Sequence, residues 1–285
     1  MGVPILVTGV PRSGTTWVAR LIATAPSTSL AGREPMNPRG RQFALAGTVD
    51  GWARLTHESS AQRRVLRRAY GGREPRVYSR YGRRQWAAPL PWSRVVVKDP
   101  FALLSVPTLA RVTSAVPVVV HRHPGAVLAS YRRMGWSPDL EEVASIVGRT
   151  RTEAPDAQLS DVPTTGLTEA ASMAVFWRSL HELFLHDSAG LVPMVVVAHE
   201  RLVGDEDTCR ALLDRLSLAW SPATEAELRH EEGRAVAPAT TLHNFDRSPQ
   251  QVVEGWRKHV TAEELAEIDE ITAPVRARLE AMSLA

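Results

Sequence analysis

The sequence has very little cysteine, little lysine and no long apolar run. Cys209 is the single cysteine, so no intrachain disulfide can form, which favours a reducing compartment such as the cytoplasm. The longest apolar stretch, Leu191 to Ala198, is far shorter than the ~20 residues that a bilayer-spanning helix needs. A strand is expected from residue 3, which leaves no room for a signal peptide. We therefore expect a cytoplasmic protein without a membrane span.

Arginine takes the place of lysine. Lys98 and Lys258 are the only lysines among 34 basic residues. Together with much alanine and valine, this bias indicates a GC-rich bacterial coding sequence. The pI is near 9.4, but the formal net charge is only +3 and the arginines are scattered. We expect no nucleic-acid partner, and an anionic small ligand is compatible with this charge. The length of 285 residues fits one α/β domain with insertions.

A glycine-bounded loop follows the first expected strand, residues 3–7. It reads Gly9-Val10-Pro11-Arg12-Ser13-Gly14-Thr15-Thr16-Trp17, and an amphipathic helical pattern continues to about residue 25. A strand, such a loop and a helix start direct several backbone N–H groups at one point, where phosphate oxygens bind well. The glycine spacing is that of a Walker loop, but Thr15 occupies the lysine position and Arg12 supplies the cation. The loop therefore suits a ligand without a γ-phosphate and without obligatory Mg²⁺.

A second phosphate-type pattern follows the strand expected at residues 116–120. Arg122 comes at the end of this strand, and Ser130 lies about two turns into the helix that Pro124 starts. The forked guanidinium and the serine hydroxyl can converge on one anion. Two such patterns in this order, roughly 110 residues apart, are the strongest functional evidence in the sequence.

Two more residues lie where parallel sheets bind ligands. Lys98 ends the β-branched run from Arg94, which is typical of a strand buried on both faces, and it therefore lies at the carboxyl edge of the sheet. In so arginine-rich a chain, a lysine there suggests a compact point charge. Glu34 is the one acid in the loop 31–40, and Pro35 restricts it to extended geometry. The sequence leaves open whether either side chain is simply solvated.

These elements predict an α/β fold with a P-loop-type parallel β-sheet of about four to five strands, flanked by helices on both faces. Residues 36–92 carry a basic helix at about 59–70 and are either connecting structure or an acceptor-binding insertion. A fourth strand is expected at 191–198, and further helices at about 167–185 and 205–216, with a last one after a capping box at 261–264. His181 and His186 are five residues apart, not the four of a metalloprotease helix, so no metal site is expected.

Several of these motifs resemble those of one enzyme family. The segment Pro11–Trp17 resembles the 5′-phosphosulfate loop of the sulfotransferases that use PAPS (3′-phosphoadenosine-5′-phosphosulfate). Arg122 and Ser130 resemble their 3′-phosphate motif. The run Lys98-Asp99-Pro100-Phe101 and the position of Glu34 are most similar to the tyrosylprotein sulfotransferases and their bacterial relatives. The resemblance covers most of the chain and implies a single sulfotransferase domain over residues 1–285.

The resemblance also implies residue roles. Glu34 is expected to be the general base, and Lys98, Arg12 and Ser248 to stabilise the transferring group. Cytosolic small-molecule sulfotransferases use a histidine just after the lysine strand, and its absence here favours Glu34. PAPS would leave as PAP (3′,5′-adenosine bisphosphate), with no metal required. The expected nucleotide-binding residues are Pro11, Arg12, Ser13, Gly14, Thr15, Thr16, Trp17, Arg122, Ser130, Arg257 and Lys258, of which the last two match the family only approximately.

The sequence does not identify the acceptor, and the expected cytoplasmic location favours the hydroxyl of a small molecule over a peptide tyrosine. The oligomeric state stays open, a homodimer included. Two alternatives are also open. A P-loop kinase-like phosphotransferase would share the fold but needs an acidic Mg²⁺ ligand, for which Asp99 is the only candidate. A non-catalytic PAP- or nucleotide-binding protein would have Glu34 pointing away from the site. Preference for ATP with Mg²⁺ would indicate the first, and PAP binding without transfer the second.

Overall fold

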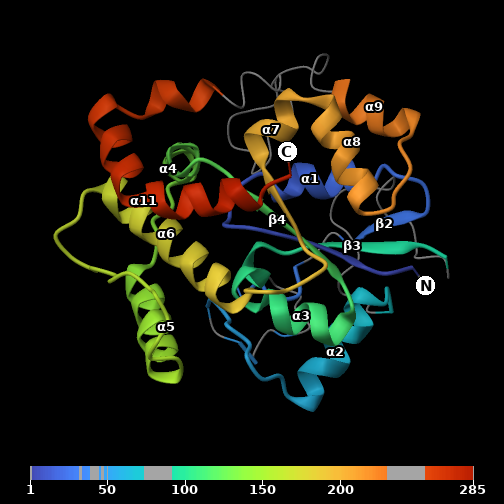
Figure 1. Ribbon diagram of the computed structural model, residues 1–285, viewed down its shortest axis with the longest axis horizontal. Helices are drawn as coiled ribbons and strands as arrows, with labels where there is room; N and C mark the ends of the chain where they lie inside the picture. Colours follow the sequence, from blue (N-terminus) through green and yellow to red (C-terminus); the bar gives the residue numbers. More distant parts are fainter. Residues whose placement is uncertain are drawn as a thin grey trace.

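Five parallel strands form one sheet at the centre of the computed structural model, in the order β2-β3-β1-β4-β5 (Figure 1). The structure describes residues 2–31, 34–38, 45, 48–49, 51–73, 92–229 and 254–284. The strands are β1 (Ile5–Thr8), β2 (Thr28–Ala31), β3 (Arg94–Lys98), β4 (Val116–His121) and β5 (Val195–Ala198). The fold class is the one that the sequence predicts.

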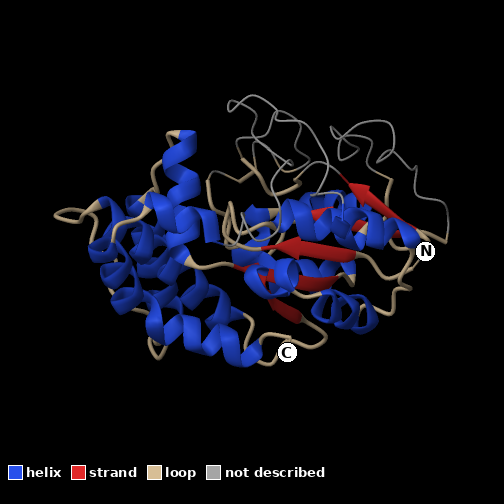
Figure 2. Ribbon diagram, turned by 90° about the horizontal axis from the view of Figure 1, so that it is seen from above, coloured by secondary structure: helices blue, strands red, loops and turns tan. Residues whose placement is uncertain are grey.

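Helices lie around the sheet on both sides (Figures 1 and 2). The α-helices are α1 (Thr15–Ile22), α2 (Ser60–Tyr70), α3 (Val106–Thr113), α4 (Pro124–Met134), α5 (Leu140–Glu153), α6 (Glu169–Asp187), α7 (His199–Gly204), α8 (Glu206–Arg215), α9 (Pro222–Arg229) and α11 (Ala262–Met282). Two 3-10 helices, η3 (Pro100–Ser105) and η5 (Gly255–His259), complete the described elements.

The sheet separates two apolar cores. Successive strand residues point to opposite faces, and accordingly Leu6 and Val97 belong to one core cluster while their neighbours Ile5 and Val96 belong to the other. The first cluster includes side chains from η3, α2, α3, α4, α5, α6 and α11, and the second includes side chains from α1 and α8. Because both faces are covered, the strands need apolar residues at nearly every position, which explains the unbroken valine runs.

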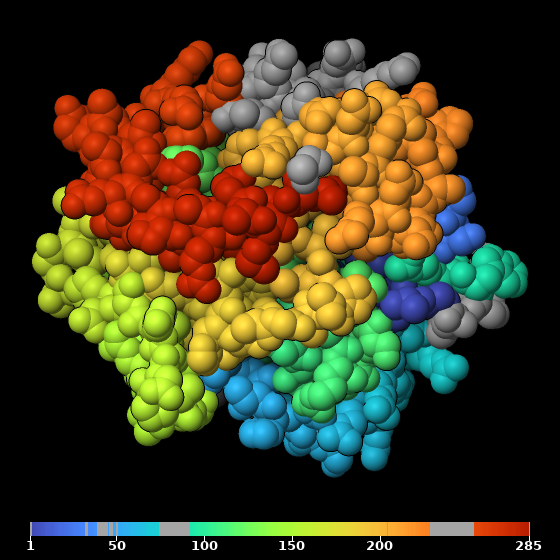
Figure 3. Space-filling model, in the orientation of Figure 1, coloured from blue at the N-terminus to red at the C-terminus, as the bar shows by residue number. Residues whose placement is uncertain are grey.

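The helix ends follow local sequence signals. Thr261 and Glu264 form the predicted capping box at the start of α11, and Ser59 and Gln62 form another at the start of α2. Helix α11 packs on α6 and lies on the face of the molecule that Figure 3 shows. These caps satisfy N–H groups that a helix start otherwise leaves without an intrahelical partner.

Two strands differ from the sequence-based expectation. Strand β2 begins directly after Pro26 and Ser27 and is not among the strands that the sequence predicts, because Thr28 and Ser29 interrupt any apolar run. Strand β5 begins at Val195, although a strand was expected from residue 191. Pro193 has no N–H and cannot join the ladder of hydrogen bonds, so the strand starts after it.

Candidate functional site

The predicted site residues gather at the edge where the parallel strands end. In spatial order this edge carries Glu34 after β2, Lys98 at the end of β3, Arg12 after β1, Arg122 after β4 and His199 after β5. Neighbouring strands are about 4.8 Å apart. The sheet order therefore sets an acid–lysine pair at one end of the edge and arginines further along it.

The loop between β1 and α1 depends on its two glycines. Gly9 has φ +152° and Gly14 has φ +91°, backbone conformations that side chains rarely adopt. A Cβ on Gly9 would lie 2.1 Å from the Val120 carbonyl oxygen, and one on Gly14 would lie 2.0 Å from a ring carbon of His199. Gly14 is the N-cap of α1 and contributes no side-chain cap. The loop thus packs tightly on β4 and on His199, the first residue of α7, and no side-chain oxygen caps the start of α1.

The two phosphate-type patterns meet in space. Arg12 Nε donates to Ser130 Oγ at 2.8 Å, across 118 residues of sequence. Arg122 Nη1 donates to the carbonyl oxygen of Arg12 at 3.4 Å. The strand-end arginine, the helix serine and the loop arginine therefore form one group, and their roles as nucleotide ligands stay predictions.

This group is electrostatically poised for an anion. The pKa of Arg122 is lowered to about 10, mainly by burial; Glu200 opposes this shift, and the charges of Arg12 and Arg133 add to it. Burial and Arg133 also lower the pKa of Arg12. Arg122 Nε lies 4.0 Å from Glu200 Oε1. Sequence reasoning missed Arg133, although its position one helical turn after Ser130 could have indicated it.

Glu34 and Lys98 form an ion pair at the other end of the edge. Lys98 Nζ donates to Glu34 Oε1, and Asn37 Nδ2 donates to Glu34 Oε2. The Lys98 side chain is 7% exposed and that of Glu34 is 19% exposed. The carboxylate is therefore held by donors at both oxygens and still reaches the surface. Asn37 was missed because no motif includes it.

Asp99, next to Lys98, is fully buried. Its Oδ2 accepts from the Met36 N–H at 2.5 Å and its Oδ1 accepts from the Phe101 N–H at 3.2 Å. Burial and, secondly, the charge of Glu34 raise the pKa of Asp99 well above its usual value. The sequence offered Asp99 only as a Mg²⁺ ligand for the kinase alternative, and the structure gives it two backbone partners instead.

His199 lies beside the β1–α1 loop and is buried. Its ring meets Trp17 edge-on, with the centroids 5.9 Å apart. Burial and the charge of Arg122 lower its pKa well below the usual histidine value, so the ring is neutral at physiological pH. Sequence reasoning assigned no role to His199, although a polar residue at the carboxyl end of a strand was the available signal.

Arg257 and Lys258 are exposed on η5, which packs on α4. Trp256 anchors η5: its ring stacks on His123 with the centroids 4.8 Å apart, and the guanidinium of Arg257 lies 5.0 Å from its ring. Both predicted cations thus lie on an element that contacts the helix bearing Ser130, and their contact with a nucleotide stays a prediction. Ser248 lies outside the described residues.

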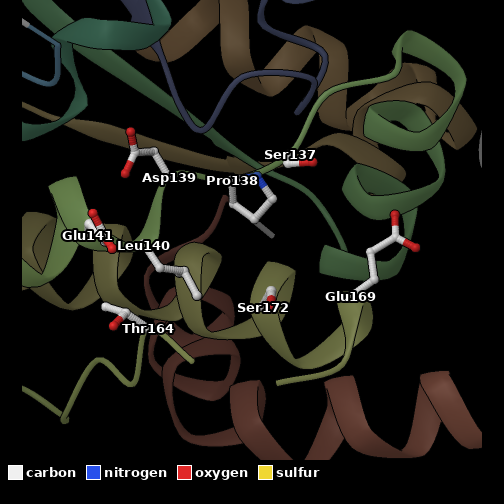
Figure 4. Close-up of a pocket in the computed structure, with 8 residues that line it drawn as sticks. All are labelled: Ser137, Pro138, Asp139, Leu140, Glu141, Thr164, Glu169 and Ser172. Atoms are coloured by element: carbon white, nitrogen blue, oxygen red, sulfur yellow. The ribbon is translucent and has the colours of Figure 1, made fainter. Parts of the chain in front are cut away.

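A pocket of about 480 Å³ opens beside the loop that joins α4 to α5. Figure 4 shows the carboxylates of Asp139 and Glu141 at one side of it and that of Glu169 at the other. Trp136, just before this loop segment, lies 6.0 Å from the Arg12 guanidinium and is 42% exposed. Because the carboxylates would repel an anion, this pocket does not suit the phosphates of a nucleotide.

The described residues hold no group of three or more His, Cys, Asp or Glu side chains arranged as metal ligands. His181 Nδ1 is hydrogen-bonded to the Trp177 carbonyl oxygen at 2.8 Å inside α6. Within the same described ranges, no helix is both long and apolar enough to cross a bilayer.

Comparison with known proteins identifies the family. Residues 4–222 match the Sulfotransferase family. The chain belongs to this family and is therefore an enzyme. A comparison with curated protein sequences gave no match.

Two solved structures are similar in fold. The sulfotransferase domain from the curacin biosynthetic pathway has a TM-score of 0.54 at 14% identity, covering 97% of this chain and 98% of that one. Mouse sulfotransferase SULT7A1 complexed with PAP has a TM-score of 0.50 at 15% identity, covering 98% of this chain and 88% of that one. At these identities the likeness supports the fold, and the site chemistry must be argued from the residues.

Proposed function

We propose that this sulfotransferase moves a sulfuryl group from PAPS to the hydroxyl of a small-molecule acceptor, with Glu34 as general base. The arrangement along the sheet edge carries the proposal. The Glu34–Lys98 pair lies at β2 and β3, and Arg12, Ser130 and Arg122 form one group at β1 and β4. A donor with two phosphate groups needs one anion site beside the reacting atoms and a second further along.

The residues of the β1–α1 loop fit a phosphate group. Ser13 Oγ is buried and has no hydrogen-bond partner within the described residues, and the start of α1 has no side-chain cap. Such donors bind an anion readily. The similar mouse enzyme is complexed with PAP, and we propose the same nucleotide here. Residues 11–17 would bind its 5′ side, and Arg122 and Ser130 its 3′-phosphate, with Arg257 and Lys258 contributing from η5.

In the proposed reaction, residues of this chain accept one proton and stabilise the charge that develops. Bound PAPS supplies the sulfuryl group and is released as PAP. Glu34 accepts the proton of the acceptor hydroxyl as its oxygen bonds to sulfur, a step worth ~10²–10⁴-fold in rate. Lys98 and Arg12 stabilise the charge on the sulfonate and the leaving phosphate, assisted by Ser248. An ammonium has three donors, so a Lys98 that contacts Glu34 can still donate elsewhere.

We further propose that the chain is closest to the tyrosylprotein branch of the family in its catalytic residues, on the strength of Lys98, Asp99, Pro100, Phe101 and Glu34. The acceptor would bind over β2 and β3 against residues 36–92, an insertion within a single domain. Helix α2 of this segment buries Leu66 and Tyr70 in the same core cluster as Val97. An acceptor-binding segment fixed to the catalytic strand in this way would hold the hydroxyl close to Glu34.

Calorimetric titration with PAP, with ATP plus Mg²⁺ as the comparator, tests the donor assignment. We expect micromolar or tighter PAP binding without metal and little binding of ATP. Preference for ATP with Mg²⁺ would contradict the proposal. Transfer from radiolabelled PAPS to a panel of phenols, sugars and alcohols then tests the reaction, and PAP binding without transfer to any of them would indicate a binding protein instead.

A further inference from the structure

Asp99 connects three parts of the molecule. It follows Lys98 at the end of β3, its Oδ1 accepts from the Phe101 N–H at the start of η3, and its Oδ2 accepts from the Met36 N–H in the loop after β2. An N-cap role at η3 needs only one acceptor oxygen, as Ser or Thr supplies. The second oxygen therefore has a separate task, which is to fix the segment that carries Glu34.

That segment transmits the constraint to Glu34. Met36 is buried, and Pro35 between it and Glu34 has its φ fixed by the ring. The residue before a proline is itself restricted to extended geometry. Few backbone torsions thus separate the Met36 amide from the Glu34 side chain, so fixing the amide fixes the position of the carboxylate.

The environment of Asp99 is costly for a carboxylate. It is fully buried, and the Tyr70 hydroxyl near it is also buried, with no hydrogen-bond partner in the described part of the chain. Burial and, secondly, the charge of Asp99 raise the pKa of Tyr70 well above its usual value. A side chain needed for packing alone would avoid this cost with an apolar group of similar size.

We propose that Asp99 is a positioning residue for the base Glu34, acting through its hydrogen bond to the Met36 amide. The inference rests on the proposed function, since it assumes that Glu34 takes the acceptor proton. It assigns Asp99 no contact with donor or acceptor. A misplacement of about 1 Å at a reacting group costs roughly 10²-fold in rate, so the loss of this hydrogen bond is measurable.

Asp99→Asn is the informative variant, because its single remaining oxygen can accept from Met36 or from Phe101 but not from both. We expect kcat to fall by roughly 10–100-fold, with the PAP dissociation constant unchanged. The readout is PAP release from PAPS with simple phenols and alcohols as acceptors, water included. Asp99→Ser keeps a short cap for Phe101 and cannot reach Met36, so it is expected to lose kcat to a similar extent if Asp99→Asn does not fold.

The matched control is Ser105→Ala at the other end of η3. Ser105 is also fully buried, and its Oγ accepts from the Leu55 N–H at 2.9 Å and donates to the Ala53 carbonyl at 2.6 Å. We expect this variant to lower the thermal midpoint and to leave kcat unchanged. Losses of kcat in both variants in proportion to their lost stability would overturn the inference, because they would show a merely structural role.

A double-mutant cycle with Glu34→Gln separates positioning from other effects. If Asp99 acts through Glu34, Asp99→Asn adds no further loss of kcat in the Glu34→Gln background. An equal loss in both backgrounds would overturn the inference and leave Glu34 as the base. If Glu34→Gln alone turns over as fast as the wild-type enzyme, the proposed mechanism is overturned and the inference with it.

Discussion

At the scale of single residues, the Glu34 side chain is constrained at both oxygens of its carboxylate. Lys98 donates to one carboxylate oxygen and Asn37 to the other. The same contacts that orient the carboxylate also keep a cation beside the point where the acceptor proton would leave. One ion pair would therefore hold both the general base, Glu34, and the cation that stabilises the transferred group, Lys98.

Replacing this base should separate binding from chemistry. We expect Glu34→Gln to lower kcat by at least ~10²-fold, the lower range for a general base, because the amide accepts no proton. PAP affinity should be unchanged, since the nucleotide ligands lie on other strands. Turnover assays and calorimetry measure the two effects. The control is Glu280→Gln on α11, which alters an exposed ion pair with Arg201 of α7 and should behave as wild type. Normal turnover of Glu34→Gln would show that Glu34 is not the base.

Arg122 is proposed to bind the nucleotide and to take no part in the proton transfer. We expect Arg122→Ala to weaken PAP binding by roughly 10–100-fold, the effect of losing a hydrogen bond to a charged group. The remaining kcat at saturating PAPS should change much less. Arg201→Ala removes an exposed arginine of α7 that pairs with Glu280 and serves as the control in the same titration. An unaltered PAP affinity of Arg122→Ala would contradict its assignment to the 3′-phosphate.

At the scale of elements, the β1–α1 loop depends on close packing as well as on backbone conformation. Gly14 and Gly135 both have positive φ, +91° and +63°, but only a Cβ on Gly14 would meet a neighbour. We expect Gly135→Ala to cost about 1–2 kcal/mol, the penalty of the left-handed conformation. Gly14→Ala should cost more and should abolish PAP binding, because the His199 ring would displace the loop. Thermal melting and PAP titration compare the two variants, and equal behaviour would show that contact with His199 is unimportant.

The strands show what local patterns can predict. The apolar runs before Gly9, Lys98 and His121 mark β1, β3 and β4, because strands buried on both faces carry apolar side chains without interruption. Strand β2 has only four residues, of which two are polar. Its pairing with β3 brings the loop of Glu34 next to Lys98, so the contact between these two residues could not be predicted from either segment.

The site was predictable where a motif spans consecutive residues, and less so elsewhere. The loop at residues 9–17 and the Arg122–Ser130 spacing are local patterns. Asn37, Arg133 and Asp99 gain their significance from segments that fold against them. Asn37 donates to a side chain three residues away, and Asp99 accepts from a backbone amide in another loop. The charge of Arg133 lowers the pKa values of two arginines that are distant in sequence. Only Arg133 has a periodic signal, since it lies one helical turn after Ser130. The contacts of Asn37 and Asp99 follow no periodicity in the sequence.

At the scale of the whole molecule, buried histidines link stability to pH. Burial lowers the pKa of His121 to about 4 and that of His181 to about 3, below the ~6.5 of an unfolded chain. As the pH falls, the unfolded chain therefore binds protons that the folded chain does not. The contribution of these neutral histidines to the free energy of unfolding is complete above pH ~6.5 and decreases as the pH falls towards 4. Asp99, whose raised pKa has the opposite sign, offsets part of this effect.

We expect the thermal midpoint to decrease as the pH is lowered from 7 to 5, because unfolding takes up protons in this range. Melting curves at constant ionic strength across this range measure the slope. The pKa of His123 is likewise lowered to about 4. Among the described residues, these histidines outweigh Asp99, the one carboxyl whose pKa is raised. A midpoint that is constant or rises as the pH falls would contradict the neutral state of these histidines.

The order of the strands has one more consequence. β1 lies in the middle of the sheet, with β3 and β2 on one side of it and β4 and β5 on the other. In the proposed function, the segments that bind the acceptor follow β2 and β3 on one flank, and those that bind the nucleotide follow the central strand β1 and β4 on the other flank. The sequence of residues 36–92 could then change during evolution, or be exchanged between relatives, without a loss of donor binding. One scaffold of this kind can acquire new acceptors by replacing a single stretch of chain.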